Sequence, residues 1–242
     1  ADVTIPREVT PRSGAPSWSE IRDLVLDQPT AETLRFLARG LICDANVLLV
    51  GETATSKSAG VQFLAALTGN PLLRISLNGQ TDTGELVGRF MPNPDPGIRC
   101  TDLEKHRQTL QPASREILDQ AVADKRELEM VDRLRIAAAE GWPPGVEQPW
   151  VFREGLVVEA LRSGAWVLLD EVNLAETAVL ERLNSVLDHP RSLVLTEHDG
   201  TRFGVTGGVP IEPRFRMLAT MNPAEYEGRS RLSQAFLNRW TL

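Results

Sequence analysis

The chain has 242 residues, 42% of them apolar and 24% charged, which fits a soluble globular protein with a sizeable buried core. A net charge of −7 argues against nucleic acid or an anionic membrane as the main partner, and no apolar run is long enough to span a bilayer. Cys43 and Cys100 lack the spacing of metal ligands, and the N-terminus lacks the layout of a signal peptide. These features favour a reducing, intracellular location, and we expect the cytoplasm.

Residues 1–17 are rich in Pro, Ser and Gly, which predicts an extended arm. The sequence leaves open whether this arm packs on a neighbour or is a disordered tail. Apolar residues then recur at helical spacing from Trp18 to Asp44 and predict two helices, the second with Thr30 as its N-cap. We assign residues 1–29 to the arm and first helix, and residues 30–242 to one α/β domain.

Residues 46–67, NVLLVGETATSKSAGVQFLAAL, predict a strand over Asn46–Val50, a turn of small residues and a helix. The turn nearly matches G-x-x-x-x-G-K-[ST], a loop whose backbone N–H groups surround nucleotide phosphates. In that loop the Lys reaches phosphate oxygens, the hydroxyl binds Mg²⁺, and the helix N-terminus adds a positive dipole. The candidate nucleotide-binding residues are therefore Gly51, Glu52, Thr53, Ala54, Thr55, Ser56, Lys57 and Ser58, with Ser58 also a metal ligand.

One residue departs from this motif. Ser56 stands where the second Gly belongs, and that Gly lets the backbone approach phosphate closely. A Cβ at this position is expected to weaken binding or to tilt the loop. The segment alone is also compatible with an ordinary strand, turn and helix that carry a chance Lys-Ser pair.

A break at residues 69–71 is followed by a predicted strand over Leu72–Leu77 and a short helix that begins near Asp82 and ends near Gly88. Residues 91–150 then form an insertion with Pro and Gly at both ends. Because Ser114–Glu140 contains neither Gly nor Pro, we expect one mostly exposed helix of roughly 40 Å there. Two interpretations of this insertion remain open: it contacts a partner, or it is a solvated decoration without a role.

Regular alternation resumes with a helix over Glu154–Ser163 and a strand over Ala165–Leu169, which runs directly into Asp170-Glu171. Four apolar residues followed by two carboxylates suit a phosphate-loop ATPase. Asp170 would then hold Mg²⁺, and Glu171 would orient and deprotonate the attacking water. By itself, such an acidic pair could simply cap the next helix.

The remaining segments predict a helix over Glu176–Leu187, a hairpin with a type I′ turn at Asp199-Gly200, and a strand over Phe215–Thr220. Asn222 follows that last strand, at the edge where ligands gather in open α/β sheets, and could position the hydrolytic water. Three arginines come next, any of which could reach a neighbouring subunit's phosphates: Arg229, Arg231 and Arg239.

Four stretches together resemble an AAA+ module of the midasin and dynein-related group, with the MoxR ATPases as nearby relatives. They are GETATSKS, FREGLVVEALRSGAWVLLDEVNLAETAVLERLNSVLD, LVLTEHDG and FRMLATMNPAEYEGRSRLSQAFLNRW. The resemblance implies a P-loop NTPase fold, a three-layer sandwich with a central parallel sheet, a β-hairpin and a helical insertion at residues 91–150. The family's C-terminal helical lid would lie outside this chain.

By the same resemblance, Lys57 and Ser58 are Walker A, Asp170 and Glu171 are Walker B, Asn222 is sensor 1, and Arg239 is the finger that acts on a neighbour. The implied function is ATP binding and hydrolysis with Mg²⁺, either in a ring, which we expect to be hexameric, or in tandem modules. The implied client is a protein, with von Willebrand A-type domains as our first candidate. Two alternatives stay open: a non-hydrolysing nucleotide-binding scaffold or sensor, suggested by Ser56, and a GTP-driven module of the McrB type.

Overall fold

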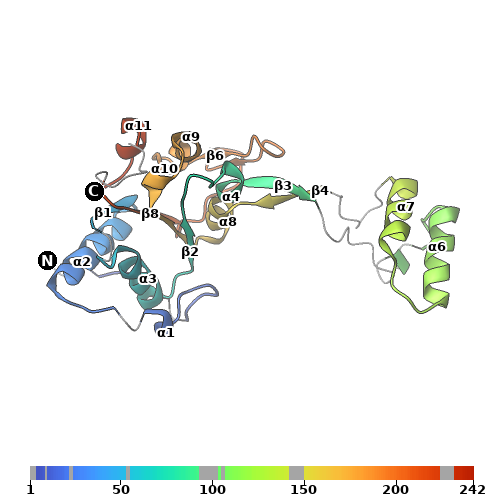
Figure 1. Cartoon of the computed structure of the whole chain (residues 1–242), viewed down its shortest axis with the longest axis horizontal. Coiled ribbons are helices and arrows are strands. Elements are labelled where there is room, and N and C mark those ends of the chain that lie inside the picture. The colour runs from blue at the N-terminus through green and yellow to red at the C-terminus, as the bar shows by residue number, and fades with distance from the viewer. Residues whose placement is uncertain are drawn as a thin grey trace. The chain divides into compact units, whose positions relative to one another are not determined.

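The computed structural model describes residues 4–8, 10–21, 24–52, 55–92, 103–104, 107–141, 150–223 and 232–242. The chain divides into two compact units, one made of residues 1–89 and 154–242 and the other of residues 90–153. Figure 1 labels most of the helices and strands of both units. Among the described helices, none combines the length and the apolar character needed to cross a bilayer.

The larger unit is built on a parallel sheet of four strands in the order β1-β8-β5-β2. These strands are β1 (Val47–Val50), β8 (Arg216–Met221), β5 (Trp166–Asp170) and β2 (Leu72–Ser76). Val50 pairs with Met221, and Ser76 pairs with Asp170, so the carboxyl ends of the strands meet at one edge of the sheet. The predicted α/β fold with a central parallel sheet is therefore confirmed, and this edge is where such sheets bind ligands.

Helices cover both faces of this sheet. On one face, α2 (Gln28–Ile42) and α3 (Lys57–Thr68) pack together, and their apolar side chains share a core with Trp166 and Leu168 of β5. Successive strand residues point to opposite faces, so Val167 and Leu169 belong to the other face, where both are fully buried. There α8 (Leu156–Ser163) packs against β5. Burial on both faces explains why this strand reads as an unbroken apolar run.

The remaining short helices of the larger unit are α1 (Trp18–Ile21), α4 (Thr83–Leu86), η1 (Val172–Leu174), α9 (Thr177–Glu181), α10 (Asn184–Leu187) and α11 (Gln234–Leu237). The predicted single helix over 176–187 is thus wrong, because α9 and α10 are separate. Between them, Leu183 N donates to Leu180 O and Val186 N donates to Leu183 O. These bonds span three residues rather than four, which tightens the chain and ends α9.

The N-terminus of α2 also differs from the prediction. Asp27, and not Thr30, is the N-cap, because its side chain accepts a 2.9 Å hydrogen bond from Thr30 N. The helix therefore begins one turn earlier and includes Pro29 in its first turn, where a missing N–H costs nothing.

The hairpin is formed by β6 (Leu193–Val194) and β7 (Arg202–Phe203), which pair antiparallel. Its turn is not type I′, because that turn needs positive φ at both central residues, and only Gly200 of the pair 199–200 has one, at 75°. The connection is wider instead. Gly200 N donates to Leu195 O, and the Asp199 side chain accepts a 2.9 Å bond from Thr201 N.

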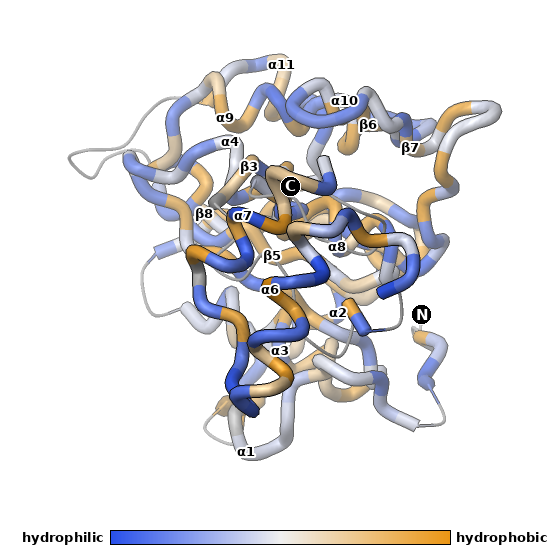
Figure 2. The backbone as a smooth tube through the Cα atoms, turned by 90° about the vertical axis from the view of Figure 1, so that its right-hand side faces the viewer, coloured by the Kyte–Doolittle hydropathy of each residue, from blue (hydrophilic) through white to orange (hydrophobic). Residues whose placement is uncertain are grey.

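The unit of residues 90–153 contains the helices α6 (Pro112–Ala123) and α7 (Met130–Glu140). It also contains most of a two-stranded ribbon made of β3 (Gly88–Pro92) and β4 (Trp150–Glu154), whose first two and last residues belong to the larger unit. The prediction of one long helix here is wrong, because the chain turns after α6, where Lys125 has a φ of 49°. Figure 2 shows that hydrophilic and hydrophobic residues alternate along both helices. The turn lets the two apolar faces bury Leu118 and Ile136 in one small core, whereas a single exposed helix would leave them in water.

The described part of the N-terminal arm packs on the larger unit's own surface, beside the C-terminal end of α3. Glu8 N donates to Thr68 O, Arg12 N donates to Gly69 O, and Leu72 N donates to Gly14 O. These bonds hold the described arm residues against the larger unit, so a disordered tail, one of the two alternatives considered, does not describe them.

Candidate functional site

The loop between β1 and α3 places a helix N-terminus at the carboxyl edge of the sheet. α3 begins at Lys57, and Ser56 before it adopts the left-handed conformation, with φ 55° and ψ 21°. Glycine adopts this conformation without steric cost, so the backbone has the shape that the motif's second Gly favours although Ser56 stands there. The Ser56 side chain makes no capping bond to α3. The first N–H groups of the helix are therefore not used by that side chain and suit an anion.

The ammonium of Lys57 is surrounded by oxygen acceptors at this edge. Its Nζ donates to Gly51 O at 2.7 Å, to Glu52 O at 2.5 Å, to Thr55 Oγ1 at 3.1 Å and to Asn222 Oδ1 at 3.1 Å. Two of these acceptors are backbone carbonyls of the loop itself. Phosphate oxygens are stronger acceptors of the same kind because they are charged.

A buried carboxylate lies beside the first turn of α3. Asp170, at the end of β5, is only 6% exposed, and its Oδ1 accepts a 2.8 Å bond from Ser58 Oγ and another from Thr220 Oγ1. Burial raises the pKa of Asp170, but the hydrogen bonds from Thr220, Ser58 and Arg74 outweigh it and leave that pKa below its ordinary value. A hydroxyl and an ionised carboxylate in contact form the kind of hard oxygen pair that Mg²⁺ prefers.

The second oxygen of Asp170 is held by a residue that the sequence analysis did not find. Arg74, in the middle of β2, donates from Nε at 3.1 Å and from Nη2 at 2.5 Å to Asp170 Oδ2. The signal was a charged residue inside the mostly apolar strand LLRIS. Its partner lies 96 residues away, so only the pairing of β2 with β5 reveals the contact.

Glu171 and Asn222 lie at the ends of adjacent strands and contact each other. Asn222 Nδ2 donates to Glu171 Oε1 at 3.2 Å, while Asn222 Oδ1 accepts from Lys57. Because an ammonium only donates and a carboxylate only accepts, these partners fix the orientation of the amide. Asn222 is 4% exposed, and its backbone oxygen accepts a 2.9 Å bond from Asn173 Nδ2, a second contact that the sequence analysis missed.

These groups surround one cavity of about 240 Å³. The lining residues are Thr55, Ser56, Lys57, Ser58, Ala59, Asp170, Glu171, Thr220 and Asn222. Of the other candidate loop residues, Gly51 and Glu52 contact Lys57 through their carbonyls, and Thr53 and Ala54 lie outside the described residues. The structure therefore brings the candidates of the loop, of β5 and of β8 to one place.

The residues of this cavity fit a magnesium-bound nucleoside triphosphate. Within the described ranges, no group of three or more His, Cys, Asp and Glu side chains could hold a metal ion alone. A cation here would depend on Ser58, Asp170 and oxygens of its ligand, which is the usual way in which proteins hold Mg²⁺. Lys57 and the start of α3 supply the positive groups that phosphates require.

Arg239 does not line this cavity. Its guanidinium donates to Asp188 Oδ1 at 2.7 Å and Oδ2 at 3.4 Å, and its backbone oxygen accepts a 3.1 Å bond from Asn46 Nδ2. Asn46 precedes β1, so the Arg239 backbone lies at the end of that strand opposite to the phosphate loop. The other two arginine candidates, Arg229 and Arg231, lie outside the described residues.

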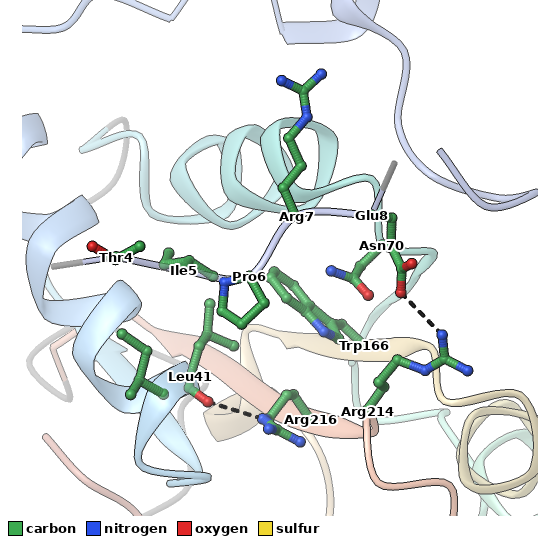
Figure 3. A pocket seen from close by; sticks show the side chains of 11 residues that line it. Thr4, Ile5, Pro6, Arg7, Glu8, Leu41, Asn70, Trp166, Arg214 and Arg216 are labelled. Carbon is green, nitrogen blue, oxygen red and sulfur yellow. Dashed lines mark hydrogen bonds and ion pairs between the residues drawn. The ribbon is translucent and has the colours of Figure 1, made fainter. Parts of the chain in front are cut away.

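A larger cavity, of about 410 Å³, lies at the opposite edge of the sheet, where β5 and β8 begin. Figure 3 shows that Trp166, Arg214 and Arg216 lie beside the N-terminal arm, while Arg7 extends away from the other side chains. Two of its three arginines already have partners: Arg214 bonds to Glu8 at 3.0 Å, and Arg216 donates to Leu41 O at 3.1 Å. This cavity lacks a strand-to-helix loop for phosphates, so its greater volume does not make it the better nucleotide site.

Comparison with known proteins gives results consistent with this geometry. The model of the family described as "AAA domain (dynein-related subfamily)" matches residues 120–240. Midasin from Dictyostelium discoideum is 31% identical over 213 residues, which are 88% of this chain and 3% of that protein. Midasin from Giardia intestinalis is 26% identical over 221 residues, 91% of this chain and 3% of that protein.

The chain thus corresponds to a small part of these two relatives. A solved structure from Cytophaga hutchinsonii, named a "putative ATPase", has a TM-score of 0.51 and 19% sequence identity, over 92% of this chain and 47% of that one. At this identity the likeness concerns the fold alone. Since the family model covers half of the 242 residues and includes Asp170, Glu171, Asn222 and Arg239, the chain belongs to the AAA domain family, in its dynein-related subfamily.

Proposed function

We propose that this chain is an AAA+ module that binds and hydrolyses ATP with Mg²⁺. One observation carries the proposal: Lys57, Asp170, Glu171 and Asn222 come from three separate parts of the sequence and line a single cavity at the carboxyl edge of the sheet. A cation, a buried carboxylate, a second carboxylate and an amide at this place are the groups that phosphoryl transfer to water requires.

Each side chain has a role that suits its chemistry. Lys57 neutralises charge on the terminal phosphates, and Ser58 and Asp170 hold Mg²⁺, which when bound neutralises further phosphate charge. Glu171 accepts a proton from the attacking water. Asn222 keeps the Glu171 carboxylate in place through its 3.2 Å hydrogen bond and helps to orient that water.

We further propose that such modules act in a ring, as separate subunits or as tandem modules of one polypeptide. Arg239 supports this proposal, because it is held by Asp188 away from the cavity of its own chain and is therefore suited to another module's site. An arginine supplied by a neighbour stabilises the charge of the transferring phosphoryl group. The client would be a protein, and the resemblance to the midasin group makes von Willebrand A-type domains the first candidate.

The test is ATP turnover by the 242-residue chain and its Glu171→Gln variant, measured with Mg²⁺ over a range of protein concentrations. We expect hydrolysis to fall about 10²- to 10⁴-fold while ATP affinity stays within a few fold, because only proton transfer is lost. Glu181→Gln, an exposed carboxylate on α9, is the matched control and should hydrolyse ATP at the wild-type rate. Measurable turnover in the wild type at the same rate as in Glu171→Gln would refute the role of Glu171.

A second candidate function is a nucleotide-binding scaffold that does not hydrolyse. Ser56 favours it, because its Cβ stands in the loop where phosphate approaches the backbone. Tight ATP binding without turnover in the wild type, together with a large gain of hydrolysis in Ser56→Gly, would support the scaffold and exclude the hydrolysing module.

A further inference from the structure

Arg74 carries a positive charge next to the candidate site and can balance the negative charge of Asp170. The family features described above do not include this arginine. Its guanidinium places both Nε and Nη2 on one oxygen, Oδ2 of Asp170, at 3.1 and 2.5 Å. The other oxygen, Oδ1, takes the hydroxyls of Ser58 and Thr220. The two oxygens of the carboxylate therefore have different partners. Oδ1 faces α3 and the candidate metal ligand Ser58, and Oδ2 faces β2 and Arg74.

The position of Arg74 relative to the cavity indicates how it acts. Asp170 lines the cavity, but Arg74 is absent from the lining, so the guanidinium lies on the β2 side of the carboxylate. Arg74 is 42% exposed, whereas the Asp170 side chain is 9% exposed. An effect of Arg74 on a ligand in the cavity would therefore pass through Asp170, which makes Arg74 a positioning residue and not a catalytic one.

The charges of the site give this position a consequence. The cavity contains one cation, Lys57, and two carboxylates, Asp170 and Glu171. Arg74 brings the local sum to zero, and without it the sum is −1. Nucleoside triphosphates are strongly anionic, so a buried carboxylate without a counter-charge would repel a nucleotide that arrives without a metal ion.

We propose that Arg74 neutralises Asp170 in the metal-free protein, so that the site binds nucleotide before or without Mg²⁺. This inference rests on the nucleotide-binding function proposed above. Bound Mg²⁺ supplies positive charge on the other side of the same carboxylate, so Arg74 matters less when Mg²⁺ is present. Removal of the guanidinium raises the dependence of nucleotide binding on magnesium.

The experiment measures the dissociation constant of a fluorescent ATP analogue for the 242-residue chain, once with excess Mg²⁺ and once with EDTA. The quantity of interest is the ratio of the EDTA value to the Mg²⁺ value, which does not require hydrolysis. In Arg74→Gln we expect affinity in EDTA to fall about tenfold and affinity in Mg²⁺ to change less than about threefold. Arg74→Lys, which keeps the charge and loses the two-pronged contact, should restore most of the affinity in EDTA.

Arg162→Gln is the matched control. Arg162 is also 42% exposed and ion-paired, with Glu154 at 2.8 Å, but it precedes β5 and so lies at the end of that strand opposite to Asp170. For Arg162→Gln, the ratio of the dissociation constant in EDTA to that in Mg²⁺ should equal the wild-type ratio. A general loss of packing would lower both affinities together and would not be rescued by Lys.

The outcomes separate the two proposals. If the wild type binds the analogue and Arg74→Gln keeps the wild-type ratio, the role of Arg74 is overturned and the nucleotide site stands. If Arg74→Gln loses affinity equally in both conditions, the role of Arg74 is likewise overturned. If the wild type binds under neither condition, the proposed function itself fails, and this inference fails with it.

Discussion

Two residues at the candidate site adopt a conformation that amino acids other than glycine seldom use. Ser56 has a φ of 55° and Glu171 a φ of 58°, and each stands in the turn between a strand and the helix that follows it. The left-handed conformation costs a residue with a Cβ roughly 1–2 kcal/mol. Both residues line the cavity, so each places strained backbone where a ligand would bind, as at many functional sites. Asp44 and Lys125 also have positive φ but do not line this cavity.

Ser56→Gly should therefore stabilise the protein. We expect the free energy of unfolding to rise by about 0.5–1.5 kcal/mol, because glycine removes the left-handed penalty but makes the unfolded chain more flexible. Urea denaturation measures this change. Lys125→Gly is a matched control in the smaller unit, where φ is 49°; it should give a similar gain and leave nucleotide affinity unchanged. A loss of stability in Ser56→Gly would contradict the strain argument.

At the scale of elements, the hairpin is tied to the end of α9 by one ion pair. Arg182 donates to Glu197 through Nε at 2.8 Å and Nη2 at 2.9 Å, and the two side chains are 23% and 28% exposed. The bond from Arg182 lowers the pKa of Glu197 from 4.5 to about 2. A lowered pKa means that this pair stabilises the folded chain above pH 4.5 and that its contribution is lost as the pH falls toward 2.

Glu197→Gln should lower the free energy of unfolding by about 1 kcal/mol at pH 7, since the pair is partly exposed. The difference from wild type should shrink steadily below pH 4.5, where the wild-type carboxylate becomes protonated. Urea denaturation of both proteins between pH 7 and pH 3 measures it. Glu181→Gln serves as the comparison and should stay within about 0.5 kcal/mol of wild type throughout. A difference for Glu197→Gln that is independent of pH would contradict the electrostatic account.

The elements also show what a sequence can and cannot predict. The strands ending at Val50, Asp170 and Met221 were predictable because apolar runs and the polar residues that follow them are local signals. The contact of Arg74 with Asp170 was not predictable, because it depends on which strands become neighbours. The turn at Lys125 was missed because it contains neither Gly nor Pro, and only the packing of α6 against α7 favours it.

For the whole molecule, the main feature is that each of the two units has its own core. In the unit of residues 90–153, Leu118 is fully buried and packs with Ala121, Ile136 and Ala137. The larger unit has a separate core between its sheet and helices. Damage to the smaller core should therefore leave the sheet and its carboxyl edge intact.

Leu118→Ala tests this independence. Removal of a fully buried leucine side chain should destabilise the smaller unit by about 2–5 kcal/mol. Amide hydrogen exchange should then speed up in residues 107–141 and stay unchanged in β1, β5 and β8. The exposed Leu134→Ala on α7 is the control and should change exchange little. Faster exchange in the sheet of the Leu118→Ala protein would show that the two units unfold together.

The bond between Asn222 and Pro223 bears on how the protein ages. Asparagine side chains are slowly converted to aspartate in two steps: the backbone nitrogen of the next residue attacks the side-chain carbonyl and displaces ammonia, and water then opens the cyclic imide that has formed. Proline offers no backbone N–H for this attack, so Asn222 is protected by its neighbour. The protection is useful at this position, because an aspartate here would lose the amide group that donates to Glu171 and would add a third negative charge to the cavity. Long-stored protein should therefore retain this side chain, while asparagines that do not precede a proline, such as Asn78 before Gly79, decay.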